Sequence, residues 1–219
     1  MYCNLAFPAL YRTGICSDMI FPGKCKYLIA LASFAVRVKR IGDFGVKHSG
    51  LPTHITVREG TVAEREAIAK LTKAAYSEYA SESDPEFWAR YETSTESTLL
   101  TDDSVLRLVA DVGGTIAATV LLCPPYDVKF GEKRVQNPYP EMRLLAVSPA
   151  HRKFGLGALL IDECEKRVRE SGSESITLHT TILMKTAKAM YERRGYERYT
   201  QIDFEPVPGF VVWGYKKNF

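Results

Sequence analysis

Two glycines that follow a pair of basic residues form the segment best suited to chemistry. Arg152 and Lys153 precede Gly155 and Gly157, between an apolar run and a stretch with helical periodicity. The first turn of a helix presents N–H groups without intrahelical acceptors, together with the positive end of the helix dipole. Glycine lets an anion approach this backbone closely because no Cβ intervenes. The segment therefore predicts a cradle for a pyrophosphate group.

The spacing excludes two other phosphate loops. The pattern Gly-x-x-x-x-Gly-Lys-Ser/Thr is absent, and the first glycine of Gly-x-Gly-x-x-Gly is missing. The alternative is a tightly packed helix entry with no ligand, which the flanking arginine and apolar strand disfavour.

Two motifs carry a resemblance to a known family. Arg152-x-x-Gly155-x-Gly157 resembles the Arg/Gln-x-x-Gly-x-Gly/Ala signature of the GNAT N-acetyltransferase superfamily. The segment from Ala187 through Tyr191 to Tyr196 is similar to that family's Ala-x-x-Leu-Tyr-x-x-x-Gly-Phe segment. The resemblance covers about residues 54–219. It implies a mixed α/β fold, GNAT-like, with a central and mostly antiparallel β-sheet flanked by helices.

The resemblance also implies a reaction and a cofactor site. An N-acetyltransferase of this kind moves the acetyl group of acetyl-CoA directly to a primary amine of a small molecule or peptide, without a metal. Its strand before the glycine loop would bind the pantetheine arm as an added strand does. The residues expected to bind the cofactor are Leu145, Ala146, Val147, Arg152, Lys153, Phe154, Gly155, Leu156, Gly157 and Ala158.

Two residues receive catalytic roles from the same resemblance. Tyr191 matches the general acid that protonates the departing CoA thiolate, and Glu141 stands where some members place a general base. Each has a simpler alternative, since Tyr191 could be a core aromatic residue and Glu141 an exposed strand acid. Phe87, Trp88 and Tyr91 either line an acceptor pocket or belong to the core. One departure is Met184, which replaces an asparagine common in the family.

The elements that must position these residues follow from periodicity and turn signals. A helix is predicted to begin at Thr61, where Thr61 and Glu64 have the spacing of a capping box. A short helix is predicted after Asp84-Pro85, and two more at 155–171 and 186–194. A proline-rich loop is expected between residues 123 and 141. Strands are predicted at 54–58, 105–111, 115–123, 141–147, 176–180, 196–204 and 210–215.

Charge divides the chain into two parts. Residues 1–53 hold seven Lys/Arg and two Asp, a net charge of +5, whereas the remaining residues hold 22 Lys/Arg and 24 Asp/Glu, a net charge of −2. We expect residues 1–53 to be a basic, poorly ordered extension, or sequence upstream of the true start, and 54–219 to form the acetyltransferase domain. A minority alternative for the apolar run at 28–36 is a secretory signal.

Composition limits the other function classes. The 46% hydrophobic and 25% charged content is that of a globular protein, and the apolar run at 28–36 is shorter than the roughly 20 residues that span a bilayer. The five cysteines show no zinc spacing and no disulfide framework, which favours a reducing, cytoplasmic location. We expect no nucleic-acid or membrane partner, and a homodimer is compatible with the sequence. The competing function is a non-catalytic acyl-CoA-binding sensor or interaction module on the same fold.

Overall fold

A single large sheet forms the centre of the described chain. The computed structural model describes residues 54–130 and 133–219, so the expectations for residues 1–53 lie outside it. The strands run in the order β1-β2-β3-β6-β7-β10-β8, with β9 paired to β10. Only β6 and β7 are parallel to each other; every other pairing in this sheet is antiparallel. The strands are β1 (Ile55–Glu59), β2 (Leu106–Val112), β3 (Thr115–Cys123), β6 (Glu141–Val147), β7 (Ser175–Thr180), β8 (Glu197–Arg198), β9 (Phe204–Val207) and β10 (Phe210–Asn218).

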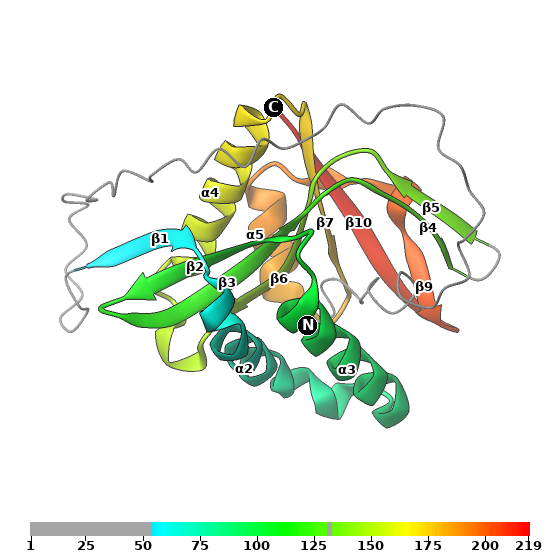
Figure 1. Ribbon diagram of the computed structural model, residues 1–219. Helices are drawn as coiled ribbons and strands as arrows, with labels where there is room; N and C mark the ends of the chain where they lie inside the picture. Colours follow the sequence, from blue (N-terminus) through cyan, green and yellow to red (C-terminus); the bar gives the residue numbers. More distant parts are fainter. Residues whose placement is uncertain (1–53, 131–132) are drawn as a thin grey trace.

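Helices cover both faces of this sheet (Figure 1). On one face lie α2 (Arg65–Tyr76) and α3 (Pro85–Thr101), and on the other lie α4 (Leu156–Glu170) and α5 (Lys185–Arg193). In the described part of the chain, short 3₁₀ helices lie between these elements: η1 (Val62–Glu64), η2 (Ser77–Glu82), η3 (Pro149–His151) and η4 (Thr200–Ile202). This is the mixed, mostly antiparallel sheet flanked by helices that the sequence predicts. No helix in the described ranges has the length and apolar content needed to cross a membrane.

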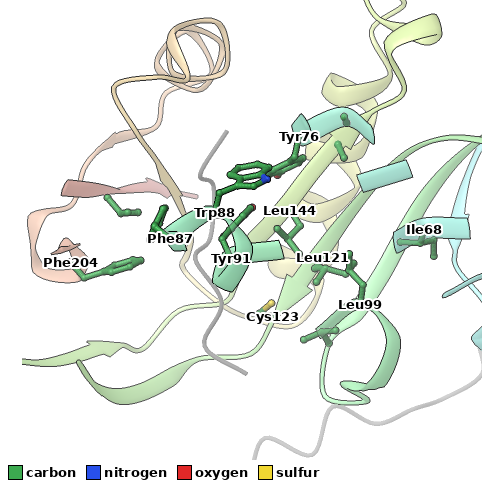
Figure 2. Packing of buried hydrophobic residues seen from close by; sticks show 14 of the residues in the cluster. Ile68, Tyr76, Phe87, Trp88, Tyr91, Leu99, Leu121, Cys123, Leu144 and Phe204 are labelled. Atoms are coloured by element: carbon green, nitrogen blue, oxygen red, sulfur yellow. The ribbon is translucent and has the colours of Figure 1, made fainter. Parts of the chain in front are cut away.

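The sheet separates two apolar cores, and β6 contributes to both. Leu144 and Ala146 pack on the side of α2 and α3, in the cluster drawn in Figure 2. Met142 packs on the side of α4, as do Leu145 and Val147. Strict alternation would place residues 142 and 144 on the same face. The strand therefore changes its facing between Met142 and Leu144.

A β-bulge causes this change. Leu144 has a φ of 51°, a conformation that residues with a Cβ rarely adopt. The pairing of β3 with β6 shifts register at the same place, where Arg143 faces Leu121 and Ala146 faces Thr119. The bulge lies in the strand that the sequence assigns to cofactor binding.

The structure differs from the predicted elements in three places. The strand predicted at 196–204 is wrong: only Glu197–Arg198 form β8, residues Thr200–Ile202 form η4, and β9 begins at Phe204. The helix after Asp84 is not short, since α3 has 17 residues. Its middle is rich in Ser and Thr, which hides its helical periodicity; Thr93 and Thr98 donate their hydroxyls to carbonyls four residues earlier. The expected loop between β3 and β6 instead contains a hairpin of β4 (Tyr126–Phe130) and β5 (Lys133–Asn137). The prolines flank this hairpin and do not interrupt it.

Candidate functional site

The central feature of the site is the separation of β6 from β7. The two strands pair at only two positions, Glu141 with Thr177 and Met142 with Leu178. Within the described residues, the part of β6 from Arg143 to Val147 has no register partner on β7. One edge of β6 is therefore available to an extended ligand, which could bond to it as an added strand would.

The bulge at Leu144 adds to this opening on the other edge of β6. Leu144 and Leu145 have no register partner on β3. The hydroxyl of Tyr76, at the end of α2, donates to the Leu145 carbonyl at 3.3 Å. The strand predicted to bind the pantetheine arm is thus fixed from the α2 side while its β7 side is open.

The glycine loop lies directly after this strand and begins α4. Gly155 is the N-cap of α4 and has a φ of 78°, which a residue with a Cβ would adopt only with strain. The first turn of α4, from Leu156 to Ala158, contains no acidic residue. Its N–H groups lack acceptors within the helix, so they can bind an anion.

Gly157 brings this first turn close to β6. A Cβ at position 157 would lie 3.6 Å from Val147 Cγ2 and 3.9 Å from Leu145 Cδ2. The glycine loop and the open strand are therefore one continuous surface. Its donors suit a ligand with a pyrophosphate at one end and an amide-bearing arm at the other.

The structure gives Arg152 a partner that the sequence does not indicate. Its guanidinium binds the Glu78 carboxylate through two contacts, Nη1 to Oε2 at 2.7 Å and Nη2 to Oε1 at 3.0 Å. Nη2 also donates to the Ala75 carbonyl at 3.3 Å. The hydrogen bond to Glu78 raises the pKa of Arg152. By contrast, Lys153 is exposed and has a φ of 69°.

Glu141 is a buried carboxylate at the point where the strands separate. It is fully buried, so the alternative of an exposed strand acid is wrong. Its Oε1 accepts from Arg143 Nε at 2.7 Å and lies 3.3 Å from His179 Nδ1. Its Oε2 accepts from the Tyr126 hydroxyl at 2.8 Å and from Asn137 Nδ2 at 3.2 Å. Both oxygens are thus occupied by two partners each.

These partners determine the acidity of Glu141. Burial alone raises the pKa of a carboxyl group, but the nearby charges of Arg143 and His179 outweigh it and hold the pKa of Glu141 well below its ordinary value. Burial and the adjacent carboxylate raise the pKa of Tyr126, which keeps its phenol protonated. Glu141 is therefore ionised in neutral solution, and Tyr126 is a neutral donor to it.

Tyr191 belongs to α5 and packs on the face opposite α2 and α3. It is 2% exposed, and its ring lies edge-on to Tyr196 with 5.8 Å between centroids. Met184, the N-cap of α5, is also buried, and its Sδ accepts from the Thr180 hydroxyl at 3.4 Å. Tyr191 is thus part of a core, while its place at the C-terminal end of α5 agrees with the predicted motif.

A cavity of about 390 Å³ lies between α2 and α3. Trp88 and Tyr91 line it together with Tyr76, whose hydroxyl reaches β6. Figure 2 shows these three aromatic side chains side by side in the core. Trp88 and Tyr91 are therefore both core residues and cavity walls. Phe87 does not line this cavity. It packs in the core, with its ring centroid 5.9 Å from that of Phe210.

Comparisons with known proteins agree with this geometry. Residues 66–196 match the model of the acetyltransferase (GNAT) family. A mouse protein named "Probable N-acetyltransferase family 8 member 5" is 30% identical over 90 residues, which span 41% of this chain and 37% of the mouse protein. The match thus spans little more than a third of that relative's length.

Solved structures share the fold at low sequence identity. The PaiA N-acetyltransferase of Thermoplasma acidophilum, solved with coenzyme A, is 15% identical with a TM-score of 0.57, covering 76% of this chain and 99% of that one. A GNAT family acetyltransferase of Brucella melitensis, solved with acetyl-CoA, is 19% identical with a TM-score of 0.52, covering 76% and 88%.

Proposed function

Because the chain belongs to the acetyltransferase (GNAT) family, we propose that it moves the acetyl group of acetyl-CoA directly to a primary amine of a small molecule or peptide. The observation that carries this proposal is the separation of β6 from β7 immediately before the glycine loop. That arrangement offers backbone groups to an extended arm and helix N–H groups to a pyrophosphate. Two relatives of the same fold are described with coenzyme A or acetyl-CoA.

The proposed cofactor site uses backbone more than side chains. The N–H groups from Arg152 to Ala158 would bind the pyrophosphate, and Leu145 to Val147 would bond the pantetheine arm. A backbone N–H of β6 near the bulge would stabilise the oxyanion that forms on the acetyl carbonyl. No acidic residue lies in the first turn of α4, so nothing there repels the phosphates.

The proposed transfer is direct, by addition to the acetyl carbonyl and elimination of the thiolate, with no acyl-enzyme. The neutral amine nitrogen attacks the carbonyl carbon of the thioester, a C–N bond forms, and the C–S bond breaks. Tyr191 gives its phenolic proton to the departing sulfur. The nitrogen gives up one proton, which Glu141 receives. Atoms balance as an acetamide and free CoA. The enzyme returns to its starting state when Glu141 releases the proton that it received and Tyr191 regains one from solvent.

The surroundings of Glu141 determine how that proton arrives. The carboxylate is fully buried, whereas Tyr126, one of its donors, is partly exposed. We place Tyr126 between the amine and Glu141. As its oxygen takes the proton from nitrogen, its own proton passes to Oε2 across the 2.8 Å hydrogen bond. The nitrogen is a much stronger acid once it has bonded to the carbonyl carbon, so a weakly basic carboxylate suffices.

A thiol-release assay with acetyl-CoA and a panel of primary amines tests this function. Release of CoA thiol that depends on one class of amine, with the acetylated product found by mass spectrometry, is the expected result. Calorimetry with CoA forms the second measurement. Tight CoA binding without acetylation of any amine or peptide would instead support the acyl-CoA sensor. The occupied carboxylate of Glu141 and the buried Met184 are the features that favour this second candidate.

A further inference from the structure

We propose that Glu78 is a positioning residue for the cofactor loop and acts through Arg152. The inference rests on the proposed function, because it concerns the binding of CoA to the same loop. Glu78 belongs to η2, on the α2 side of the sheet, and is 74 positions from Arg152 in the sequence. Its carboxylate therefore fixes a loop that is remote from it along the chain.

The contacts hold the guanidinium of Arg152 at three points. Two are the paired bonds to the Glu78 oxygens, and the third is the bond from Nη2 to the Ala75 carbonyl. Paired bonds between a planar guanidinium and a carboxylate fix direction as well as distance. The position of Arg152 is thus determined by the end of α2 and by η2.

The residue after Arg152 explains why this loop needs such an anchor. Lys153 has a φ of 69°, in the left-handed region that favours glycine. Strained backbone persists only where the surrounding structure holds it. Lys153 lies between the anchored Arg152 and the N-cap Gly155, so the anchor holds it in this conformation. That conformation directs the loop into the first turn of α4.

The same contacts change the role of Arg152 in cofactor binding. Its charge is already balanced by Glu78, and both of its terminal nitrogens are engaged. The pyrophosphate would then be bound by backbone N–H groups, with Lys153 as the nearby exposed cation. Arg152 would contribute by shaping the loop.

Calorimetry with CoA on Glu78→Gln and Glu78→Ala tests the proposal. The Glu78 side chain is 41% exposed, so both variants should fold. We expect the Kd for CoA to rise about three- to fivefold, the size of a partly exposed ion pair. In amine acetylation, the KM for acetyl-CoA should rise by the same factor while kcat at saturating acetyl-CoA is unchanged. Glu82→Gln is the matched control, because Glu82 is an exposed acid of η2 that forms no ion pair with the described residues.

A double-mutant cycle separates positioning from general electrostatics. Lys153→Gly removes the strain that the anchor opposes, so Glu78→Ala should raise the Kd much less in that background than in the wild type. An equal effect in both backgrounds would overturn the proposal. So would an unchanged or tighter Kd in Glu78→Gln, which would make Arg152 a direct phosphate ligand and Glu78 its competitor. Failure of the wild-type chain to bind CoA would overturn the proposed function itself and this inference with it.

Discussion

Glu141 and His179 face each other across the point where β6 and β7 separate, with 3.3 Å between Oε1 and Nδ1. The other ring nitrogen of His179 lies 2.8 Å from the Ile202 carbonyl. A carbonyl and an ionised carboxylate both only accept hydrogen bonds, so Nε2 donates to Ile202 and the contact with Glu141 is attractive when Nδ1 also carries a proton. Both side chains are fully buried. The two diverging strands are thus joined at their junction by a buried polar contact.

The first prediction concerns stability in acid. The net effect of its surroundings is to lower the pKa of Glu141, so its ionised form is favoured by folding. The stabilisation is therefore fully present above the unfolded pKa of about 4.3 and is lost as the pH falls below that value towards the folded pKa. Glu141→Gln would leave Arg143 buried without its carboxylate and should cost about 3 kcal/mol of unfolding free energy near pH 7. The difference between wild type and variant should shrink below pH 4.

Urea unfolding at several pH values measures this difference. Glu96→Gln, on the exposed part of α3, serves as a control that changes one charge without touching the buried cluster. A constant difference between wild type and Glu141→Gln from pH 7 to pH 3 would contradict the prediction, since it would mean that the ionisation of Glu141 is not coupled to folding.

The second prediction concerns the proton route. Tyr126→Phe removes the hydroxyl that donates to Glu141 Oε2 and should lower kcat about 100-fold, the low end for a proton-transfer group. The KM for acetyl-CoA should hold, because Tyr126 is not part of the cofactor loop. Steady-state kinetics with one amine measures both. Tyr139→Phe is a suitable control, since Tyr139 precedes β6 and contacts Tyr199 through its ring. An unchanged kcat in Tyr126→Phe would exclude the relay.

The elements that present the cofactor site could be predicted from local sequence. Strand β6 has the predicted bounds, 141–147, and α4 begins one residue after the expected position. Both follow from signals within a few residues of each other: an apolar run, a proline after it, and glycines at a helix start. The predicted family and fold class are confirmed as well.

The partners of the site residues could not be predicted in the same way. Glu78 and Arg152 are far apart in sequence, and an acidic residue in a polar stretch indicates only a solvated surface. Tyr126 and Asn137 reach Glu141 from a hairpin that the neighbouring prolines concealed. The alternation of Tyr126, Val128 and Phe130 is the signal that could have revealed its first strand. The bulge at Leu144 has no signal in sequence, because its residue is not glycine.

The third prediction tests the anion site. Gly157→Asp should weaken CoA binding on the order of 100-fold, because a carboxylate would stand beside the pyrophosphate at short range. Folding should be nearly unaffected, since a Cβ at 157 meets Val147 at an ordinary contact distance of 3.6 Å. An acid in the first turn also suits the helix dipole. Calorimetry gives the affinity and thermal unfolding the stability.

Gly157→Ala separates the two effects of that substitution. It adds the Cβ without the charge, so it should fold as the wild type does and show how far the Cβ alone hinders the ligand. Equal CoA affinity in wild type and folded Gly157→Asp would mean that no phosphate lies at the start of α4.

The fourth prediction concerns the first part of the chain. A protein lacking residues 1–50 should fold and bind CoA as the full chain does, because every residue assigned to the site lies within 54–219 and the charge balance changes at that boundary. Melting temperature and CoA affinity, measured on both proteins, provide the check. A large fall in either value on truncation would show that residues 1–50 belong to the domain.

The last prediction assigns the general acid. Tyr191→Phe keeps the ring, so the edge-on contact with Tyr196 at 5.8 Å should survive and the fold should hold. Only the phenolic proton is lost, and the CoA sulfur must then leave unprotonated or take a proton from water. We expect kcat to fall about 10- to 100-fold, at or below the low end for general acid catalysis, because a thiolate is a fair leaving group. The KM for acetyl-CoA should change little, since the lost interaction belongs to the transition state.

Tyr196→Phe is the matched control, because it removes a neighbouring buried phenol that donates to Glu165 Oε1 at 3.2 Å. That loss should lower the melting temperature only modestly, because Lys217 and Arg169 still donate to Glu165 Oε2, while kcat holds. If both variants turn over at the wild-type rate under conditions where chemistry limits, Tyr191 is a core residue only and another group must protonate the sulfur. If the KM for acetyl-CoA rises in Tyr191→Phe and kcat holds, the phenol binds the cofactor and takes no part in proton transfer.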